Sequence, residues 1–191
     1  MSLLLYSVIG VIIAFIATGY FHGVHHEVVW QVGTFEGLDG VAQVHVGHYK
    51  DIVNVYEGVK QASVQNSIVS SEEANVVPYF GIYYDDPEKV KDSTKWRSKG
   101  GIVLPKANAA KAVDTEYYKV VHFPPQRALM TEFPLVSQLS IFIGLFKVFP
   151  AMDAYEKKIN EYFGSIIEIH DYANKKIKYI ALEKTSPSSA F

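Results

Sequence analysis

Two groups of side chains in this sequence have the chemistry and the spacing for metal binding or acid–base catalysis. They are the segment Asp85-Asp86-Pro87 and the histidines His22, His25 and His26. Aspartate before proline is typical of turns and helix caps, and nothing near the segment supplies a third ligand. His22 and His26 would be neighbours on a helix face, but no carboxylate or thiolate motif completes a metal site. No acid–base pair is evident from spacing, so we predict no metal, no cofactor and no enzymatic activity.

An apolar run opens the chain and carries no Asp, Glu, Lys or Arg from Ser2 to His26. A helix needs about 20 apolar residues to cross a bilayer, and the run from Leu3 to Phe21 is long enough. A secretory signal would begin with basic residues, which are absent here. We therefore expect residues 1–24 to form a single transmembrane anchor, with lipid contacts through residues 3–21. A buried core helix is the alternative.

The location of such an anchor is left open by the residues on either side of it. Lys and Arg are too sparse in both flanks to orient it, because the first lysine after the run is Lys50. No Arg-rich amphipathic presequence is present. The endoplasmic reticulum and the mitochondrial inner membrane are therefore both compatible with the sequence.

The remaining sequence has the composition of one folded domain. The 191-residue chain is 49% hydrophobic and 20% charged, with a net charge of −2 and no cysteine. This balance gives no reason to expect nucleic acid as a partner. The lack of cysteine excludes disulfides, thiol nucleophiles and zinc–thiolate sites. We expect one domain over residues 28–184 and a short flexible Ser/Pro-rich tail over 185–191.

Apolar periodicity predicts the elements of this domain. Alternating residues predict strands at 41–46, 76–84, 96–104, 117–123 and 127–133, and a hairpin of 166–170 with 177–182. Helical spacing predicts helices over 49–61 and 135–160, with Pro150 kinking or dividing the second. The two halves share a strand–helix–strand–strand order. We therefore predict a duplicated α+β domain: an antiparallel sheet, two helices on one face, and a groove between the halves.

The order of four segments resembles the GyrI-like small-molecule-binding domain, a SOUL- and Rob-C-terminal-like fold. With the N-terminal anchor, the sequence also resembles the membrane-anchored testis-expressed protein family, whose best-known member is an autophagy receptor of the endoplasmic reticulum. The resemblance covers roughly residues 1–184. The segments that carry it are Tyr-Phe-Gly-Ile-Tyr-Tyr-Asp-Asp-Pro at 79–87, Phe123-Pro124-Pro125, Phe-Pro-Ala-Met-Asp-Ala-Tyr at 149–155, and Ile-Ile-Glu-Ile-His at 166–170.

The GyrI-like resemblance implies a hydrophobic cation in the groove, facing an acidic residue on a late strand. Glu168 matches that position, although His170 stands where the family has tyrosine. The alternative is that Glu168 pairs with Lys178 on the neighbouring strand. Glu132 is a second acidic candidate, although strand alternation could turn it to solvent. Aromatic residues that could line the groove, or equally form plain core, are Tyr49, Tyr83, Trp96 and Phe133.

Three functions are compatible with these features. The receptor family uses a long acidic tail with an aromatic-x-x-aliphatic motif, whereas this sequence ends at Phe191 and matches that pattern only at residues 35–38. We favour a non-enzymatic, single-pass membrane protein whose GyrI-like domain is a protein-interaction or scaffold module. Its partners would then be other subunits of a larger membrane complex. The alternatives are an adaptor of the endoplasmic reticulum and a binder of small hydrophobic cations.

Overall fold

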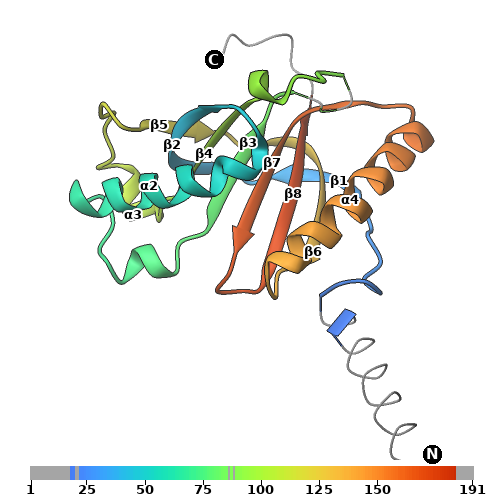
Figure 1. The fold of residues 1–191 in the computed structure, drawn as a ribbon, viewed down its shortest axis with the longest axis horizontal. Helices are drawn as coiled ribbons and strands as arrows, with labels where there is room; N and C mark the ends of the chain where they lie inside the picture. The colour runs from blue at the N-terminus through green and yellow to red at the C-terminus, as the bar shows by residue number, and fades with distance from the viewer. Residues whose placement is uncertain (1–17, 20–21, 86, 88, 184–191) are drawn as a thin grey trace, which may run out of the picture.

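The computed structural model describes residues 18–19, 22–85, 87 and 89–183 of the chain. Within them, eight strands form one antiparallel sheet in the order β1-β6-β8-β7-β3-β4-β2-β5 (Figure 1). The strands are β1 (Gln31–Phe35), β2 (Leu38–Val46), β3 (Tyr79–Tyr83), β4 (Arg97–Val103), β5 (Lys119–Phe123), β6 (Gln126–Pro134), β7 (Phe163–Asp171) and β8 (Lys176–Glu183). The helices are α2 (Ile52–Gln65), α3 (Lys106–Ala109) and α4 (Gln138–Ile159), with 3-10 turns η1 (Tyr49–Asp51), η2 (Glu73–Asn75) and η3 (Ser93–Lys95).

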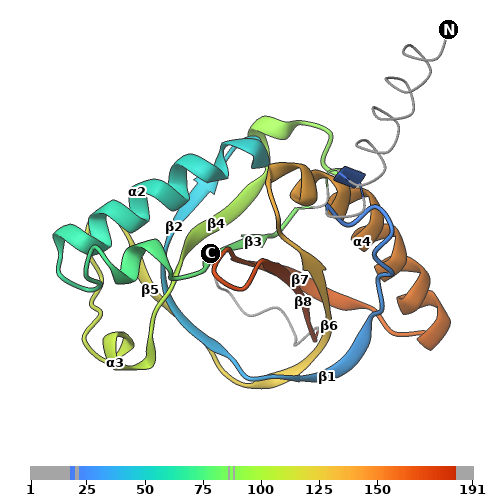
Figure 2. The ribbon, with the colours of Figure 1, turned by 90° about the horizontal axis from the view of Figure 1, so that it is seen from below.

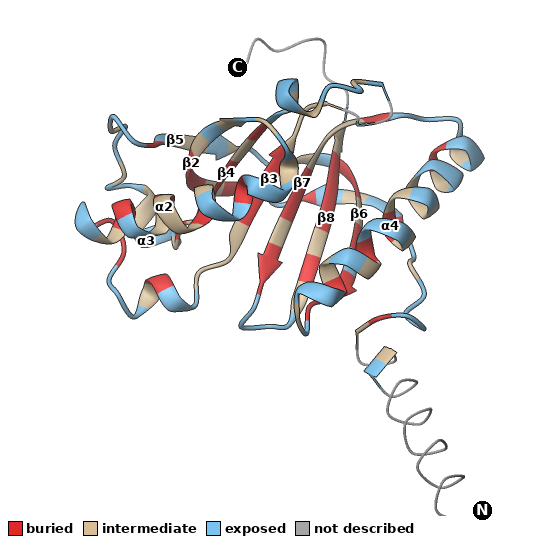
Figure 3. Ribbon diagram, in the orientation of Figure 1, coloured by how far each residue is buried: buried red, intermediate tan, exposed pale blue. Residues whose placement is uncertain are grey.

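The sheet is strongly curled, and α2 and α4 lie on its outer side (Figure 2). Alternation along the strands separates two faces. On β3, Phe80 and Ile82 join the cluster on the inner face, which also contains Ile167 and Ile180. The residues between them, such as Tyr79, face the helices. Buried and less buried residues accordingly alternate along the central strands in Figure 3.

Helix α2 covers the half of the sheet formed by β2 and β4. Its buried residues include Ile52, Tyr56 and Val59, at the spacing of one helical face. Val59 packs in one cluster with Val41 of β2 and Ile102 of β4. The helix is preceded by η1, so the first turn of the predicted helix is a 3-10 turn.

Helix α4 covers the other half and runs through Pro150 as one element. Ser137 caps its start by accepting the Leu139 N–H at 3.1 Å, and Asn160 ends it in the left-handed conformation with φ 54°. Proline removes one backbone N–H, and the helix is held beside it by Trp30, whose Nε1 donates to the Val148 carbonyl at 3.1 Å. Packing on the sheet therefore outweighs the local cost of the proline, and the predicted division into two helices does not occur.

The structure contradicts the predicted membrane-anchored fold class. Across the described ranges, no helix combines the length and the apolar character needed to cross a bilayer. Residues 3–17 and 20–21 of the predicted span lie outside these ranges. The predicted single-pass localisation, in the endoplasmic reticulum or the mitochondrial inner membrane, rested on this anchor and is corrected with it.

The histidine-rich segment after the apolar run packs against the domain. Lys147 of α4 donates to the carbonyl oxygens of Gly23, Val24 and His26 at 3.3, 2.6 and 2.5 Å. The His26 ring meets Phe133 edge-on at 5.2 Å between centroids. Contacts with α4 and β6 therefore hold this segment against the domain.

Candidate functional site

A buried carboxylate lies on the outer face of the sheet, in its central strand β7. Glu168 is 3% exposed and His170 is 6% exposed. The two residues are two positions apart and so share a face. Glu168 Oε2 lies 3.2 Å from His170 Nε2. The tautomer of the imidazole decides which of the two atoms donates. Burying a carboxylate costs several kcal/mol unless it is paired, which makes this imidazole an essential neighbour.

Three tyrosines from three different elements surround Glu168. Tyr179 of β8 is its register partner on one side, and Gly81 of β3 is its partner on the other. Tyr56 of α2 and Tyr83 of β3 bring their hydroxyls within 3.4 Å of each other. Burial raises the pKa of all three phenols, and the nearby Glu168 charge raises each further. The carboxylate is therefore surrounded by neutral phenols.

Two glycines make room for these phenols and place the site between the helices. A Cβ on Gly81 would lie 2.4 Å from the Tyr56 hydroxyl and 2.9 Å from the Tyr83 hydroxyl. A Cβ on Gly144 of α4 would lie 2.8 Å from the Tyr179 hydroxyl. Tyr56 belongs to α2 and Gly144 to α4, so both helices reach the surroundings of Glu168.

The Tyr179 hydroxyl adds an unsatisfied polar group to this site. It is buried, and the described residues give it no hydrogen-bond partner. Buried hydroxyls are normally satisfied by protein, water or ligand, because leaving one unpaired costs free energy. The site thus combines a buried charge with spare hydrogen-bonding capacity.

An aromatic row runs across the outer face next to Glu168. Tyr49 of η1 packs at 4.8 Å from Tyr83 and at 4.9 Å from Trp96, measured between ring centroids. Further along, Tyr79 stacks on Tyr56 at 5.4 Å and meets Tyr172 edge-on at 6.1 Å. We call these six residues the aromatic row: Trp96, Tyr49, Tyr83, Tyr56, Tyr79 and Tyr172. Aromatic faces both bury apolar groups and attract cations.

Asp85 fixes one end of this row. The Tyr49 hydroxyl donates to the Asp85 carbonyl at 2.7 Å and accepts the Asp85 N–H at 3.1 Å. Arg97 binds the Asp85 carboxylate through Nε at 2.9 Å and Nη2 at 2.8 Å. These hydrogen bonds from Arg97 lower the pKa of Asp85. Asp85 therefore positions Tyr49 at the end of β3, while Asp86 lies outside the described residues.

The candidates chosen from sequence fall into three environments. Glu168 and Tyr83 belong to the buried site, and Tyr49 and Trp96 to the aromatic row. Phe133 is fully buried beneath α4 in the core cluster that also contains Tyr179. Glu132 is exposed and accepts a salt bridge from Lys176 at 2.9 Å. Ile169, not Glu168, is the register partner of Lys178, so that lysine belongs to the opposite face.

Three residues of the site were not among those candidates: His170, Tyr56 and Tyr179. His170 could have been found from its position two residues after Glu168 on one strand. Tyr179 required the exact pairing of β7 with β8. Tyr56 lies on a helical face whose spacing is equally typical of plain core, so only the packing of α2 on the sheet reveals its role.

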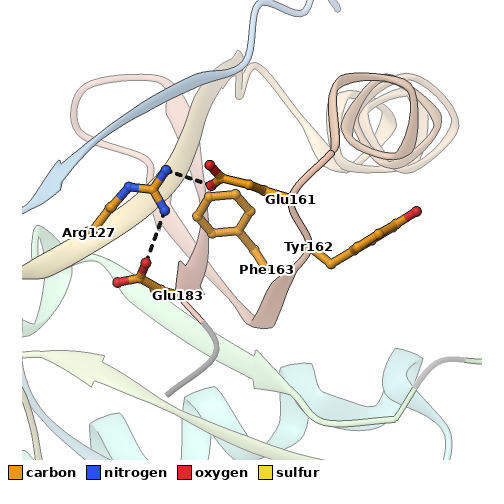
Figure 4. A pocket seen from close by; sticks show the side chains of 5 residues that line it. All are labelled: Arg127, Glu161, Tyr162, Phe163 and Glu183. Atoms are coloured by element: carbon orange, nitrogen blue, oxygen red, sulfur yellow. Dashed lines mark hydrogen bonds and ion pairs between the residues drawn. The ribbon is translucent and has the colours of Figure 1, made fainter. Parts of the chain in front are cut away.

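A separate cavity lies beside Arg127 at the end of the sheet where β8 finishes (Figure 4). The Arg127 guanidinium binds Glu161 at 2.6 Å and Glu183 at 3.0 Å, and it lies 5.5 Å from the centre of the Phe163 ring. Two carboxylates thus already bind this cation, which disfavours recognition of an anionic ligand there. Among the described residues, no three His, Cys, Asp or Glu side chains gather as a metal site.

Comparison with solved structures identifies the fold. The chain is similar to the C-terminal domain of EcmrR, with 8% identity, a TM-score of 0.57, and coverage of 83% of this chain and 99% of that domain. The chain is also similar to EcmrR in a complex with DNA, with a TM-score of 0.58 and 9% identity. The match covers 91% of this chain and 65% of the EcmrR chain. A bacterial transcription regulation protein from Staphylococcus aureus MU50 has a TM-score of 0.51 and 9% identity, over 83% of this chain and all of that one.

These neighbours have the GyrI-like, SOUL-type fold, and the described residues of this chain have it too. No protein-family model and no curated protein matches the sequence. The comparisons give no support to the membrane-anchored receptor family, to membrane lipid or to membrane-protein subunits as partners. At this level of identity the likeness shows the fold alone.

Proposed function

We propose that this protein binds a small apolar cation at Glu168, between α2 and α4. The single observation that carries the proposal is a carboxylate only 3% exposed, next to an imidazole and enclosed by phenols. A buried charge of this kind calls for an opposite charge. The aromatic row beside it provides the faces that an apolar cation would contact.

Each residue around Glu168 would make a different kind of contact with the ligand. Glu168 supplies the charge, and the Tyr179 hydroxyl supplies a hydrogen-bonding group that the described protein leaves unused. Tyr56 of α2 and Tyr83 of β3 lie beside Glu168 with their hydroxyls 3.4 Å apart. That separation is beyond the usual range for an O–H···O hydrogen bond, so parting the two phenols costs little. We infer that a ligand enters by displacing this pair.

The resemblance at residues 79–87 and 166–170, together with the GyrI-like fold, supports ligand binding over the other functions considered. We further propose that the protein binds its ligand without chemical conversion. A subunit role in a membrane complex and an adaptor role on the endoplasmic reticulum find no support in the comparisons. The absence of nucleic-acid binding stays a prediction from the net charge of −2.

Calorimetric titration with tetraphenylphosphonium tests the proposal. Triphenylphosphine oxide is the neutral ligand control, and Glu132→Gln is the matched protein control because Glu132 is an exposed glutamate of the same sheet. We expect saturable binding of the cation by the wild type and by Glu132→Gln. We expect at least tenfold weaker binding by Glu168→Gln, and no preference of that variant for the cation over the neutral compound. Equal affinity of all three proteins would exclude Glu168 as the recognition group.

A further inference from the structure

The polar groups around Glu168 have more hydrogen-bonding capacity than their neighbours in the described part of the chain use. A carboxylate accepts about four hydrogen bonds. Among the described residues, Glu168 has one neighbour of this kind, His170 at 3.2 Å from Oε2. The Tyr56 and Tyr83 hydroxyls are 3.4 Å apart, which is too far for a strong hydrogen bond between them. The site therefore keeps accepting capacity that apolar contacts alone do not satisfy.

The Tyr179 hydroxyl is the second unsatisfied group, and it belongs to the side chain next to Glu168 on the sheet. Within the described ranges, three buried hydroxyls lack a hydrogen-bond partner: those of Ser98, Tyr118 and Tyr179. Of these three residues, only Tyr179 is a register partner of Glu168. Burial raises the pKa of Tyr179, and the nearby Glu168 charge raises it further, so the phenol stays neutral. A neutral phenol oxygen is free to accept a hydrogen bond from a ligand.

We propose that the ligand of this site is a planar cation with N–H groups, an amidinium or a guanidinium on an aromatic body. The inference rests on the proposed binding of a cation at Glu168 and adds the chemical class of that cation. Two parallel N–H groups match the two oxygens of a carboxylate and form charge-assisted hydrogen bonds. A further N–H group would donate to the Tyr179 hydroxyl. The delocalised charge of such a group is weakly hydrated, which lowers the cost of burying it.

A quaternary cation would use only part of this site. It offers the opposite charge and an apolar surface, but it has no N–H to donate. Its complex would leave the Tyr179 hydroxyl buried without a partner and Glu168 short of donors, and groups left in this way cost free energy. A site that hydrogen-bonds its ligand discriminates against an analogue that lacks the donor. We therefore expect quaternary cations, tetraphenylphosphonium included, to bind through charge and aromatic contact alone.

Calorimetric titration with two cations that share a biphenyl body tests the inference. Biphenyl-4-carboxamidine is an N–H cation at pH 7, and biphenyl-4-yl-trimethylammonium is its quaternary counterpart. Tyr179→Phe removes the unpaired hydroxyl of the site. Tyr118→Phe is the matched control, because it removes an equally buried and unpaired hydroxyl from the core cluster that contains Val59.

The expected result is a preference for the N–H cation that depends on Tyr179. We expect the wild type and Tyr118→Phe to bind the amidinium about tenfold more tightly than the quaternary cation. In Tyr179→Phe this preference should fall by about threefold or more, because only the amidinium loses a hydrogen bond. The affinity of this variant for the quaternary cation should stay unchanged. The wild-type comparison needs no variant, so it decides even where a substitution disturbs the fold.

The contrary results separate this inference from the proposed function. Equal affinity of the wild type for the two cations, with weaker binding of both by Glu168→Gln, would overturn the inference and leave cation binding in place. A preference that survives in full in Tyr179→Phe would also overturn it. Failure of both cations and of tetraphenylphosphonium to bind the wild type would remove the proposed function, and the inference with it.

Discussion

Glu168 and His170 form a buried pair on one face of β7, with Oε2 and Nε2 3.2 Å apart and both side chains less than a tenth exposed. The phenols of Tyr56 on α2, Tyr83 on β3 and Tyr179 on β8 surround the pair. This arrangement makes His170 the group that any ligand of Glu168 must join or displace.

Removal of the imidazole should therefore destabilise the fold. We expect His170→Phe to lower the free energy of unfolding by about 2–4 kcal/mol at pH 7, because it leaves the buried carboxylate without its donor. Urea denaturation measures the change. His170→Gln keeps a donor on a side chain of similar length and should recover about half of the loss. Equal stability of His170→Phe and wild type would show that Glu168 does not depend on this partner.

The close approach of two phenols to Gly81 predicts that a larger residue at position 81 would weaken both the fold and ligand binding. Gly81→Ala places a Cβ 2.4 Å from the Tyr56 hydroxyl and 2.9 Å from the Tyr83 hydroxyl, so both phenols must shift to make room for it. We expect a loss of about 1–3 kcal/mol in unfolding free energy from overpacking, together with weaker tetraphenylphosphonium binding. Gly33→Ala is the control, since its Cβ would meet only the flexible end of Met130. If both variants behave alike, the phenols are less constrained than the structure indicates.

The Asp85–Arg97 pair should give the protein an acid-sensitive contribution to stability. Arg97 lowers the pKa of Asp85, so the unfolded chain takes up this proton first as the pH falls. The contribution is present above about pH 4, the ordinary range of aspartate, and is lost as the pH falls further through the lowered value. We expect Asp85→Asn to cost about 1 kcal/mol at pH 7 and almost nothing at pH 2.

Urea denaturation at both pH values measures this difference. Asp153→Asn, at an exposed position of α4, is the control and should change stability little at either pH. A cost of Asp85→Asn that stays the same at pH 7 and pH 2 would contradict an ionic role for Asp85.

The buried phenols predict a loss of stability in alkali. Burial raises the pKa of Tyr56, Tyr83 and Tyr179, so the folded state keeps them neutral. Their contribution is complete below about pH 10 and declines at higher pH, where the unfolded chain releases the protons. Each phenol adds up to about 1.4 kcal/mol per pH unit to this decline.

Tyr83→Phe should make the decline of unfolding free energy with rising pH less steep, because one of the three buried phenols is removed. The slope is obtained from urea denaturation between pH 9 and pH 11.5. Tyr117→Phe, at a tyrosine that is 43% exposed, is the matched control. An unchanged slope in Tyr83→Phe would show that this phenol is not held neutral by the fold.

Local patterns predicted most of the elements but not how they meet. The hairpin of 166–170 with 177–182 was readable because alternation and a polar turn are local signals. β1 was missed because its five residues, Gln31–Phe35, form an edge strand without strong alternation of apolar and polar side chains. The continuation of α4 through Pro150 depends on contacts with Trp30, over a hundred residues away in the sequence.

In the site, too, the sequence identified single residues but not their neighbours in the fold. The resemblance pointed to Glu168, but its neighbours Tyr56 and Tyr179 come from α2 and β8, and strand register decides which residue faces which. Lys178 is only one residue away from Tyr179, the register partner of Glu168 on β8. That offset of one residue is enough to place Lys178 on the other face of the sheet. The apolar run at the N-terminus gave the strongest local signal and led to the incorrect membrane assignment, because the assignment rested on hydropathy alone.

The most direct test of the account is carbon-13 NMR of the glutamate carboxyl carbons and the histidine rings during titration with tetraphenylphosphonium. The signals can be assigned from Glu168→Gln, Glu132→Gln and His170→Gln. We predict saturable shifts of the Glu168 carboxyl and the His170 ring, with the Glu132 signal unchanged. A titration that leaves Glu168 and His170 unmoved, at concentrations where calorimetry detects binding, would contradict the assignment of this buried pair as the ligand site.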